Sequence, residues 1–241
     1  MKVAKAMATF AAAFVLISAF SVGISGSASG TTASLPEQVR VPDARPQQAG
    51  IRPAPMTGGL PGGEHACRAR LVALGVSFET LPEIDGEGAC GIPYPIKVTS
   101  LGDGVGLQPA GVMNCATAEA AARLVADAAQ PEAMRLFGKN ISAVRQSSAY
   151  VCRLRSSGEK LSEHATGNAL DISAFVLSDG HVVEVRKHEA MEKAERRFQR
   201  TVRNAACGPF KTVLGPGTDP DHATHFHLDL AERRNDGTYC R

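Results

Sequence analysis

The chain has 241 residues, of which 44% are hydrophobic and 21% charged, and its formal net charge is +2. The first 28 residues carry two lysines and no acid, so the remaining chain is electrically balanced. A balanced chain gives no support to nucleic-acid binding, which needs a basic surface, and we expect no nucleic-acid partner. The composition is that of a globular protein with a modest core, because only 5% of residues are aromatic and tryptophan is absent.

Residues 1–28 have the pattern of a signal peptide. Two lysines precede a nearly continuous apolar stretch from Ala6 to Phe20, and Gly26-Ser27-Ala28 supplies small residues for cleavage. An uncleaved membrane anchor is the alternative, although Ser18, Ser21 and Gly23 weaken this stretch as a spanning helix. We therefore expect a periplasmic or secreted protein with no membrane contact beyond the signal segment.

Residues 29–63 are rich in proline, glycine, alanine, serine and threonine and show no apolar periodicity. Such a composition offers too little apolar bulk to offset the entropy of ordering the chain, so we interpret it as a flexible linker. The remaining residues, 64–241, suit one compact domain with a single core. We expect this domain to be a monomer.

Six cysteines lie inside the predicted domain. An even number of cysteines behind an export signal favours three disulfides formed in an oxidising compartment. Six cysteines allow 15 connectivities, and sequence alone does not choose among them. Pairing neighbours in order is our expectation, which joins Cys67 to Cys90, Cys115 to Cys152 and Cys207 to Cys240.

Apolar periodicity and turn residues give the elements of the first half of the domain. We expect a short helix over 65–74, which Gly75 ends, and strands over 75–81 and 96–101. Asn114 can cap a helix that runs to about Ala129. Residues 141–154 have the pattern of a strand or a hairpin.

The second half of the domain has clearer patterns. Residues 170–177 and 181–185 predict a β-hairpin that turns at Asp179-Gly180. Residues 188–206 carry one apolar stripe among charges, which is typical of a surface helix. Residues 224–230 alternate between apolar and polar and predict a strand. Together the elements indicate an α+β fold with a mainly antiparallel sheet and flanking helices, stapled by disulfides.

Two short segments carry the chemistry. In the first, His164 and Asp171 stand seven positions apart, with Gly167 between them to allow a tight backbone path. The second, about fifty residues later, places three imidazoles within 222–227. Catalytic zinc is held by three protein ligands, which include histidine nitrogen and aspartate oxygen, and keeps a further position open. We therefore predict a Zn²⁺ site.

The predicted strand at 224–230 selects among the three later histidines. Side chains alternate along a strand, so Phe226 and Leu228 would anchor it in the core while His225 and His227 share the other face. With His164 and Asp171, His227 would complete the metal ligands. His225 would lie beside the metal, as a general base for the attacking water or as an electrostatic stabiliser of the oxyanion.

The remaining polar residues near these segments have weaker assignments. His222 either orients a ligand or the substrate, or has a structural role. Asp229 shares the face of His227 and either hydrogen-bonds to this ligand or is a charge at the strand edge. His65, His181 and His188 lie outside both segments, and we expect them to be solvated.

These segments resemble a group of zinc peptidases that includes the D-alanyl-D-alanine carboxypeptidases, the lysostaphin type and the penicillin-insensitive murein endopeptidase. More closely, the span from about Cys67 to Arg241 is similar to the extensin-like C-terminal domain family of bacterial exported proteins. The residues that carry these likenesses are Cys152-Arg153, Leu161 to Ile172, His222-x-x-His225-Phe226-His227-Leu228-Asp229 and Tyr239-Cys240-Arg241.

The peptidase resemblance implies a metallopeptidase-like zinc site and cleavage of peptide bonds in peptidoglycan stem peptides or crosslinks. By position, His164, Asp171 and His227 match its zinc ligands and His225 matches its base. The carboxypeptidases often place a glutamate where this chain has Thr224, and the His-x-x-His-x-His spacing is closer to the murein endopeptidase.

The same resemblance implies an arginine that binds a substrate carboxylate or stabilises the oxyanion, a task that suits a guanidinium. Arg153 and Arg155 are the candidates, and Arg153 is our assignment. Two hypotheses follow. The protein is an exported zinc peptidase that acts on peptidoglycan or its peptides, or it is a non-catalytic module that keeps zinc for stability and binds wall peptides.

Overall fold

The structure is a computed structural model that describes residues 60–156, 158–187, 189 and 191–241. The predicted signal peptide, residues 1–28, and nearly all of the predicted linker, residues 29–63, lie outside the described residues. The helices are α1 (Gly62–Ala73), α2 (Cys115–Leu124), α3 (Gln130–Phe137) and α4 (Lys193–Ala206). The strands are β1 (Val76–Thr80), β2 (Ile84–Asp85), β3 (Gly91–Ile92), β4 (Ile96–Leu101), β5 (Gly106–Met113), β6 (Ile141–Ser148), β7 (Ala169–Leu177), β8 (Val182–Glu184), β9 (Thr212–Leu214), β10 (Phe226–Asp229) and β11 (Tyr239–Cys240).

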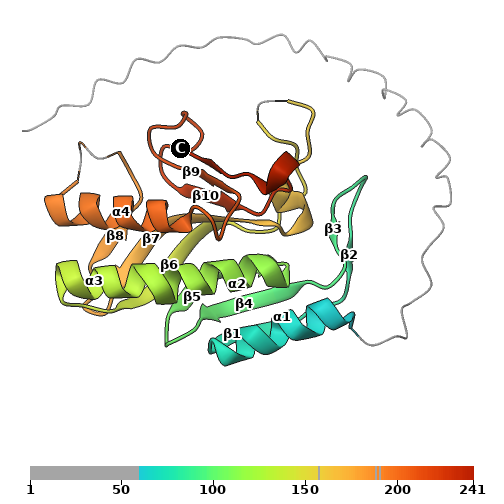
Figure 1. Ribbon diagram of the computed structural model, residues 1–241, viewed down its shortest axis with the longest axis horizontal. Coiled ribbons are helices and arrows are strands. Elements are labelled where there is room, and N and C mark those ends of the chain that lie inside the picture. The colour runs from blue at the N-terminus through green and yellow to red at the C-terminus, as the bar shows by residue number, and fades with distance from the viewer. Residues whose placement is uncertain (1–59, 157, 188, 190) are drawn as a thin grey trace, which may run out of the picture. The chain divides into compact units, whose positions relative to one another are not determined.

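The strands form one large sheet and one small one. The large sheet has the order β1-β4-β5-β6-β7-β10-β9-β11, with β8 beside β7, and β2 pairs only with β3. Pairing is antiparallel except between β5 and β6 and between β9 and β11. Figure 1 shows α2, α3 and α4 lying across one face of the large sheet, with α1 next to β1. The predicted α+β fold with a mainly antiparallel sheet is confirmed.

Strand alternation separates the helix-covered core from a polar face. Phe226 and Leu228 of β10 are buried in the same hydrophobic cluster as Phe198 of α4. Because side chains alternate along a strand, His227 and Asp229 lie on the opposite face of the sheet. The alternation predicted for this strand is therefore confirmed, and it directs two polar side chains away from the helices.

The predicted helix after Asn114 is longer than the sequence indicated. The Asn114 side chain caps α2 by accepting a hydrogen bond from the Thr117 backbone N–H at 2.8 Å, as predicted. The helical run then continues through a π-helical segment, Val125–Ala129, into α3, which ends at Phe137. Pro131 directly follows the π-helical segment, and because proline has no N–H to donate, it fits a point where the regular pattern of helical hydrogen bonds is interrupted.

Two other elements have different bounds from those predicted. The helix predicted over 188–206 begins only at Lys193, because its N-cap residue, Glu192, has an extended backbone. The strand predicted over 141–154 ends at Ser148. Strands β2, β3, β5, β9 and β11 were not expected from the sequence. All of them except β5 are only two or three residues long, and their pairing is tertiary.

The three disulfides join elements that are distant in sequence. Cys207–Cys240 is confirmed, whereas the predicted pairs Cys67–Cys90 and Cys115–Cys152 are wrong, because the structure pairs Cys67 with Cys115 and Cys90 with Cys152. Cys67 lies on α1 and Cys115 begins α2, and these two helices pack together. Helix packing, which spacing along the chain does not reveal, therefore decided the connectivity. Three disulfides are typical of proteins that fold in an oxidising compartment.

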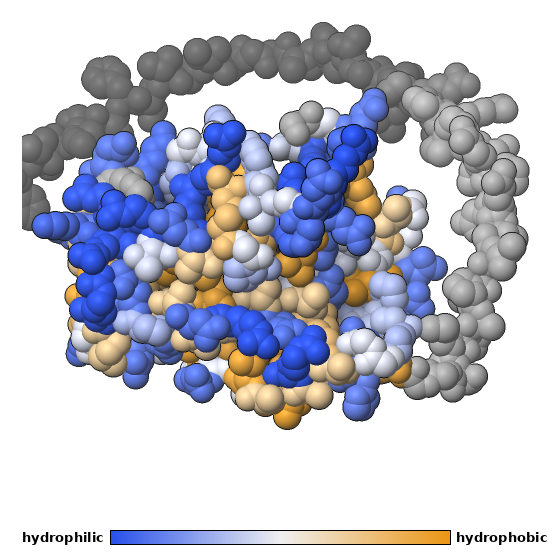
Figure 2. All heavy atoms as spheres, viewed as in Figure 1, coloured by the Kyte–Doolittle hydropathy of each residue, from blue (hydrophilic) through white to orange (hydrophobic). Residues whose placement is uncertain are grey.

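The surface over α4 is strongly hydrophilic, as Figure 2 shows for one face of the molecule. This agrees with the many charged residues of the helix, which buries mainly Phe198, Val202 and Ala206 against the sheet. Among the helices of residues 60–156, 158–187, 189 and 191–241, none has the length and hydropathy needed to cross a bilayer.

Candidate metal centre

A tight turn before β7 positions His164. Ser162 caps the short 3₁₀ helix Glu163–Thr166, and Gly167 ends it with a left-handed φ of 64°. A side chain at Gly167 would collide with Ile92, so both the backbone angle and the space require glycine. The turn brings the His164 imidazole, which is completely buried, back over the start of β7. The tight path predicted at this glycine is confirmed.

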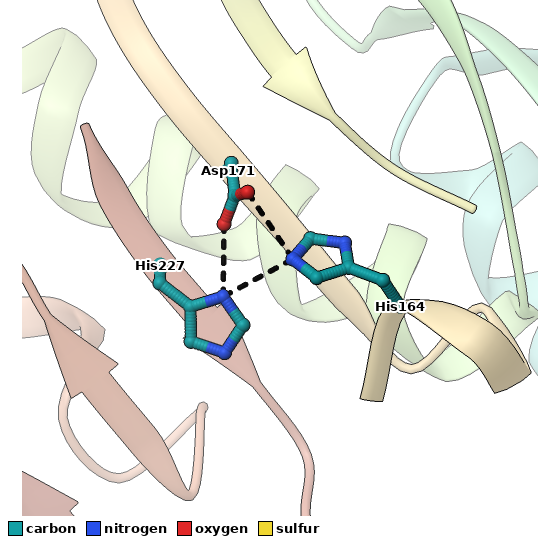
Figure 3. Close-up of side chains that lie close together, drawn as sticks. All are labelled: His164, Asp171 and His227. Atoms are coloured by element: carbon teal, nitrogen blue, oxygen red, sulfur yellow. Dashed lines mark hydrogen bonds and ion pairs between the residues drawn. The ribbon is translucent and has the colours of Figure 1, made fainter. Parts of the chain in front are cut away.

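Strand pairing brings the other two side chains together. Asp171 of β7 and His227 of β10 are direct register partners, so their side chains lie on the same face of the sheet. His227 Nδ1 lies 2.8 Å from one Asp171 oxygen, and His164 Nε2 lies 3.2 Å from the other. The two ring nitrogens are 3.2 Å apart (Figure 3). These three side chains are a candidate metal-binding group, called the metal-binding group below, and each offers one potential ligand atom within 4.8 Å of the others.

The far nitrogen of His164 fixes its tautomer. His164 Nδ1 lies 2.6 Å from the backbone carbonyl oxygen of Ala149. A carbonyl only accepts hydrogen bonds, so Nδ1 must carry the proton and donate it. In the neutral ring the Nε2 atom then presents a lone pair to Asp171 and His227.

The far nitrogen of His227 is held by a side chain instead. His227 Nε2 lies 3.0 Å from a carboxylate oxygen of Asp229, two residues further along β10. The Ala231 N–H donates to the other oxygen of Asp229 at 3.0 Å. Of the two roles left open for Asp229, the hydrogen bond to the ligand is therefore the one observed. Nε2 donates, and Nδ1 faces Asp171.

Charge is balanced inside this group. Burial by itself would raise the pKa of Asp171, but the hydrogen bonds from His164 and His227 outweigh burial and hold this pKa well below its usual range. Burial would lower the pKa of His227, and its hydrogen bonds to Asp171 and Asp229 raise this pKa to about 9. In the metal-free protein His227 is therefore protonated on both nitrogens near pH 7, and its positive charge lies against Asp171 and Asp229. A metal ion bound between the three side chains would replace the Nδ1 proton.

The residues fit a zinc ion. Two nitrogens and a carboxylate oxygen are common zinc ligands, and bonds of about 2.0–2.1 Å at tetrahedral angles put ligand atoms about 3.3 Å apart. The observed separations of 3.2, 3.2 and 2.8 Å are close to this value. Both histidines also have an acceptor on the far nitrogen, as metal-binding histidines almost always do. The side chains need little movement to hold an ion.

His225 lies beside the group but outside it. Its Nε2 is 3.8 Å from the Asp171 carboxylate, and its side chain is 19% exposed. Burial lowers the pKa of His225, and the neighbouring imidazoles add to this effect, while Asp171 opposes it. His225 is therefore neutral at pH 7 and has a lone pair that can accept a proton. Its predicted role as the base stays a prediction.

His222 forms a separate pair with an acid. Its Nδ1 lies 2.7 and 2.8 Å from the two oxygens of Asp219, and its ring centroid is 5.6 Å from that of His227. It packs against a ligand ring and makes no hydrogen bond to the metal-binding group within the described part of the chain. Of the histidines expected to be solvated, His65 and His181 are both exposed, as predicted, and His181 also lies 2.9 Å from the buried Glu195. His188 lies outside the described residues.

The profile of the family described as extensin-like protein C-terminus matches residues 65–241. The chain belongs to this family. No curated protein and no solved structure shows significant similarity to it. The matched span of the extensin-like domain holds the entire metal-binding group and all six cysteines.

A cavity of about 470 Å³ opens beside the metal-binding group of the extensin-like domain. His222 and His227 line it, together with Arg153 and Arg155. Arg155 forms an ion pair with Glu163 at 3.1 Å. The Arg153 guanidinium makes no hydrogen bond or ion pair within residues 60–156, 158–187, 189 and 191–241. The ion pair with Glu163 thus distinguishes Arg155 from Arg153, the arginine assigned from the sequence.

Sequence patterns did not identify several residues that surround the metal-binding group of the extensin-like domain. Ala149 acts through its backbone carbonyl, for which a side-chain pattern carries no signal. Thr212, the register partner of Asp229, lies on a strand of three residues that was not predicted. Asp219 stands three residues before His222, and this Asp-x-x-His spacing was the one signal that could have been read.

Proposed function

We propose that this extensin-like domain is an exported, zinc-dependent peptidase that cleaves peptide bonds of peptidoglycan stem peptides or their crosslinks. The observation that carries the proposal is the placement of the two imidazoles. His164 and His227 each donate the N–H of the far nitrogen to an acceptor outside the group, so the nitrogen that faces Asp171 is the one that would bind a metal ion. In the metal-free protein the raised pKa of His227 places a proton at this nitrogen, and a metal ion would take the place of that proton. Zinc, when bound, supplies Lewis-acid chemistry for amide hydrolysis.

The neighbouring residues provide the other functions that such hydrolysis requires. His225, neutral and 3.8 Å from Asp171, is near enough to take a proton from an attacking water through Nε2. Arg153 lines the cavity without a partner in the described chain and can bind a substrate carboxylate or a developing oxyanion. The cavity of about 470 Å³ is in the size range of sites that bind small ligands, such as a short peptide.

Export and the wall substrate rest on further observations. Three disulfides favour an oxidising compartment outside the cytoplasm. The likeness of the His-x-x-His-x-His segment to the murein endopeptidase favours peptidoglycan peptides over other substrates. The second candidate is a non-catalytic module that retains zinc and binds wall peptides, and the polar, open cavity is equally suited to binding alone.

A digestion experiment separates the two candidates. The purified protein is incubated with crosslinked muropeptides, with a chelator, and with the chelator followed by Zn²⁺, and products are read by mass spectrometry. We expect cleavage that the chelator abolishes and Zn²⁺ restores. The His225→Ala variant should keep its zinc and lose about 10²–10⁴-fold in rate, because only proton transfer is removed.

His65→Ala is the matched control, because His65 is exposed on α1 and should leave both zinc and rate unchanged. A His225→Ala variant with normal turnover would remove this residue from the mechanism. A zinc-loaded wild type that binds muropeptides and leaves all of them intact would establish the binding module. A wild type that takes up no zinc would refute the metal site itself.

A further inference from the structure

The hydrogen bond that orients His227 is the inner end of a chain of polar side chains that reaches the cavity wall. Asp229 accepts a hydrogen bond from His227 Nε2, and the Thr212 hydroxyl helps to lower the pKa of the Asp229 carboxyl from the neighbouring strand. Thr212 in turn accepts a hydrogen bond of 2.6 Å from the guanidinium of Arg233, which lines the cavity. Thr212 and Asp229 are register partners on β9 and β10, and both are buried. We call this series of side chains, His227, Asp229, Thr212 and Arg233, the relay. Sheet pairing therefore places its two middle residues side by side.

The chemistry of each group sets the directions within the relay. A guanidinium only donates, so the Thr212 oxygen accepts from Arg233 and its single proton is free for Asp229, its register partner. The carboxylate of Asp229 only accepts, so His227 must donate through Nε2. In its neutral form, the one that would bind a metal ion, the imidazole has one donor nitrogen and one acceptor nitrogen, which leaves the lone pair on Nδ1, facing Asp171 and His164.

We propose that Arg233 and Thr212 are positioning residues for the metal-binding nitrogen of His227. They hold the tautomer and ring orientation that present Nδ1 to the ion, although neither residue touches the metal-binding group itself. This inference rests on the proposed zinc site, and it assigns a function to two residues that the sequence motifs do not include. Outer partners of metal-binding histidines commonly change metal affinity by 10–100-fold.

The C-terminal strand holds the outer end of the relay in place. Tyr239 of β11 is the parallel partner of Thr212, and its backbone N–H donates to Lys211 at 2.7 Å. The Arg233 guanidinium lies 5.5 Å from the centre of the Tyr239 ring, within the range of a cation–π contact. The disulfide Cys207–Cys240 ties the next residue of β11 to the end of α4. The last disulfide thus supports the relay as well as the fold.

Four variants of the full chain, purified with disulfides intact, test the proposal. Thr212→Val removes the hydroxyl from a residue of the same shape, and Thr212→Ser restores it. Arg233→Gln replaces a group that only donates by an amide that also accepts, whereas Arg233→Lys keeps a group that only donates. Arg234→Gln is the matched control, because Arg234 is the exposed neighbour and does not line the cavity.

The readouts are zinc affinity by competition with a chromophoric chelator and the visible spectrum of the Co²⁺-loaded protein. We expect Thr212→Val to weaken zinc binding about tenfold and to change the cobalt spectrum, with recovery in Thr212→Ser. Arg233→Gln should weaken binding about threefold, the effect of one lost hydrogen bond, with recovery in Arg233→Lys. Arg234→Gln should match wild type in both measurements.

Wild-type affinity and spectrum in Thr212→Val would overturn the proposal while leaving the zinc site standing. If the wild type binds neither ion, the proposed function fails, and the relay is then judged on metal-free protein. There the downfield N–H proton signal of His227 Nε2, observed by NMR, should shift in Thr212→Val and return in Thr212→Ser. An unchanged signal would refute the relay independently of any metal.

Discussion

The two histidines of the metal-binding group are oriented by different parts of the protein. His164 is completely buried and gives its outer N–H to the backbone carbonyl of Ala149, 2.6 Å away. His227 is 12% exposed and gives its outer N–H to the side chain of Asp229, which Thr212 supports. A backbone acceptor survives any substitution that preserves the fold, whereas a side-chain acceptor can be removed by one. In the proposed metal site, the fold therefore fixes the orientation of the His164 ring, whereas the orientation of the His227 ring depends on particular side chains.

Removing either imidazole should cause the largest loss of bound zinc, whichever part of the protein orients the ring. His164→Ala and His227→Ala each delete one of three ligands, and metal content should fall from about one equivalent to nearly zero in both. Metal analysis after dialysis provides the measurement, with His65→Ala as the control that retains zinc. Stoichiometric zinc in either alanine variant would mean that this histidine is not a ligand and that the comparison is wrong.

The second prediction concerns the pH dependence of the metal-free protein, which should come from His227. Its pKa is raised from 6.5 to about 9, so its contribution to stability is complete below about pH 6.5 and is lost as the pH rises toward 9. We expect the free energy of unfolding of chelator-treated protein to fall over this window by on the order of 3 kcal/mol.

Urea denaturation at several pH values measures this dependence. His227→Gln is the control, since it keeps a polar side chain that does not titrate, and it should flatten the profile between pH 6.5 and 9. A stability that rises across the window in the metal-free wild type would contradict the ion pairs of His227 with Asp171 and Asp229.

The smallest expected effect is on zinc affinity, and it directly compares the side-chain acceptor of His227 with the backbone acceptor of His164. Asp229→Asn replaces the side-chain acceptor of His227 by an amide that also donates, and zinc affinity should weaken about 10–100-fold. Ala149→Gly keeps the carbonyl that orients His164, so affinity should remain close to wild type even though the glycine costs up to about 1 kcal/mol of stability. Equal losses of affinity in the two variants would show that backbone and side-chain acceptors are equivalent here.

Much of the centre could be predicted from the sequence because its information is local. The alternation of Phe226, His227 and Leu228 fixes which side chains face the core. The structure also confirms that Asn114 caps a helix and that Gly167 allows a tight turn. The α+β fold and the last disulfide, Cys207–Cys240, were also predicted correctly.

What the sequence could not supply depends on contacts between distant segments. The pairing of Cys67 with Cys115 follows from the packing of α1 on α2, and the register of Asp171 with His227 follows from the pairing of β7 with β10. Hydrophobic alternation specifies the face on which a side chain lies, but the partner across the sheet is set by the energy of the whole assembled core. The sequence alone thus determined which residue types face the metal-binding group. Only the tertiary structure decided that Ala149 and Asp229 orient them, because a carbonyl and a carboxylate acquire those roles only when the chain brings them within 3 Å of an imidazole.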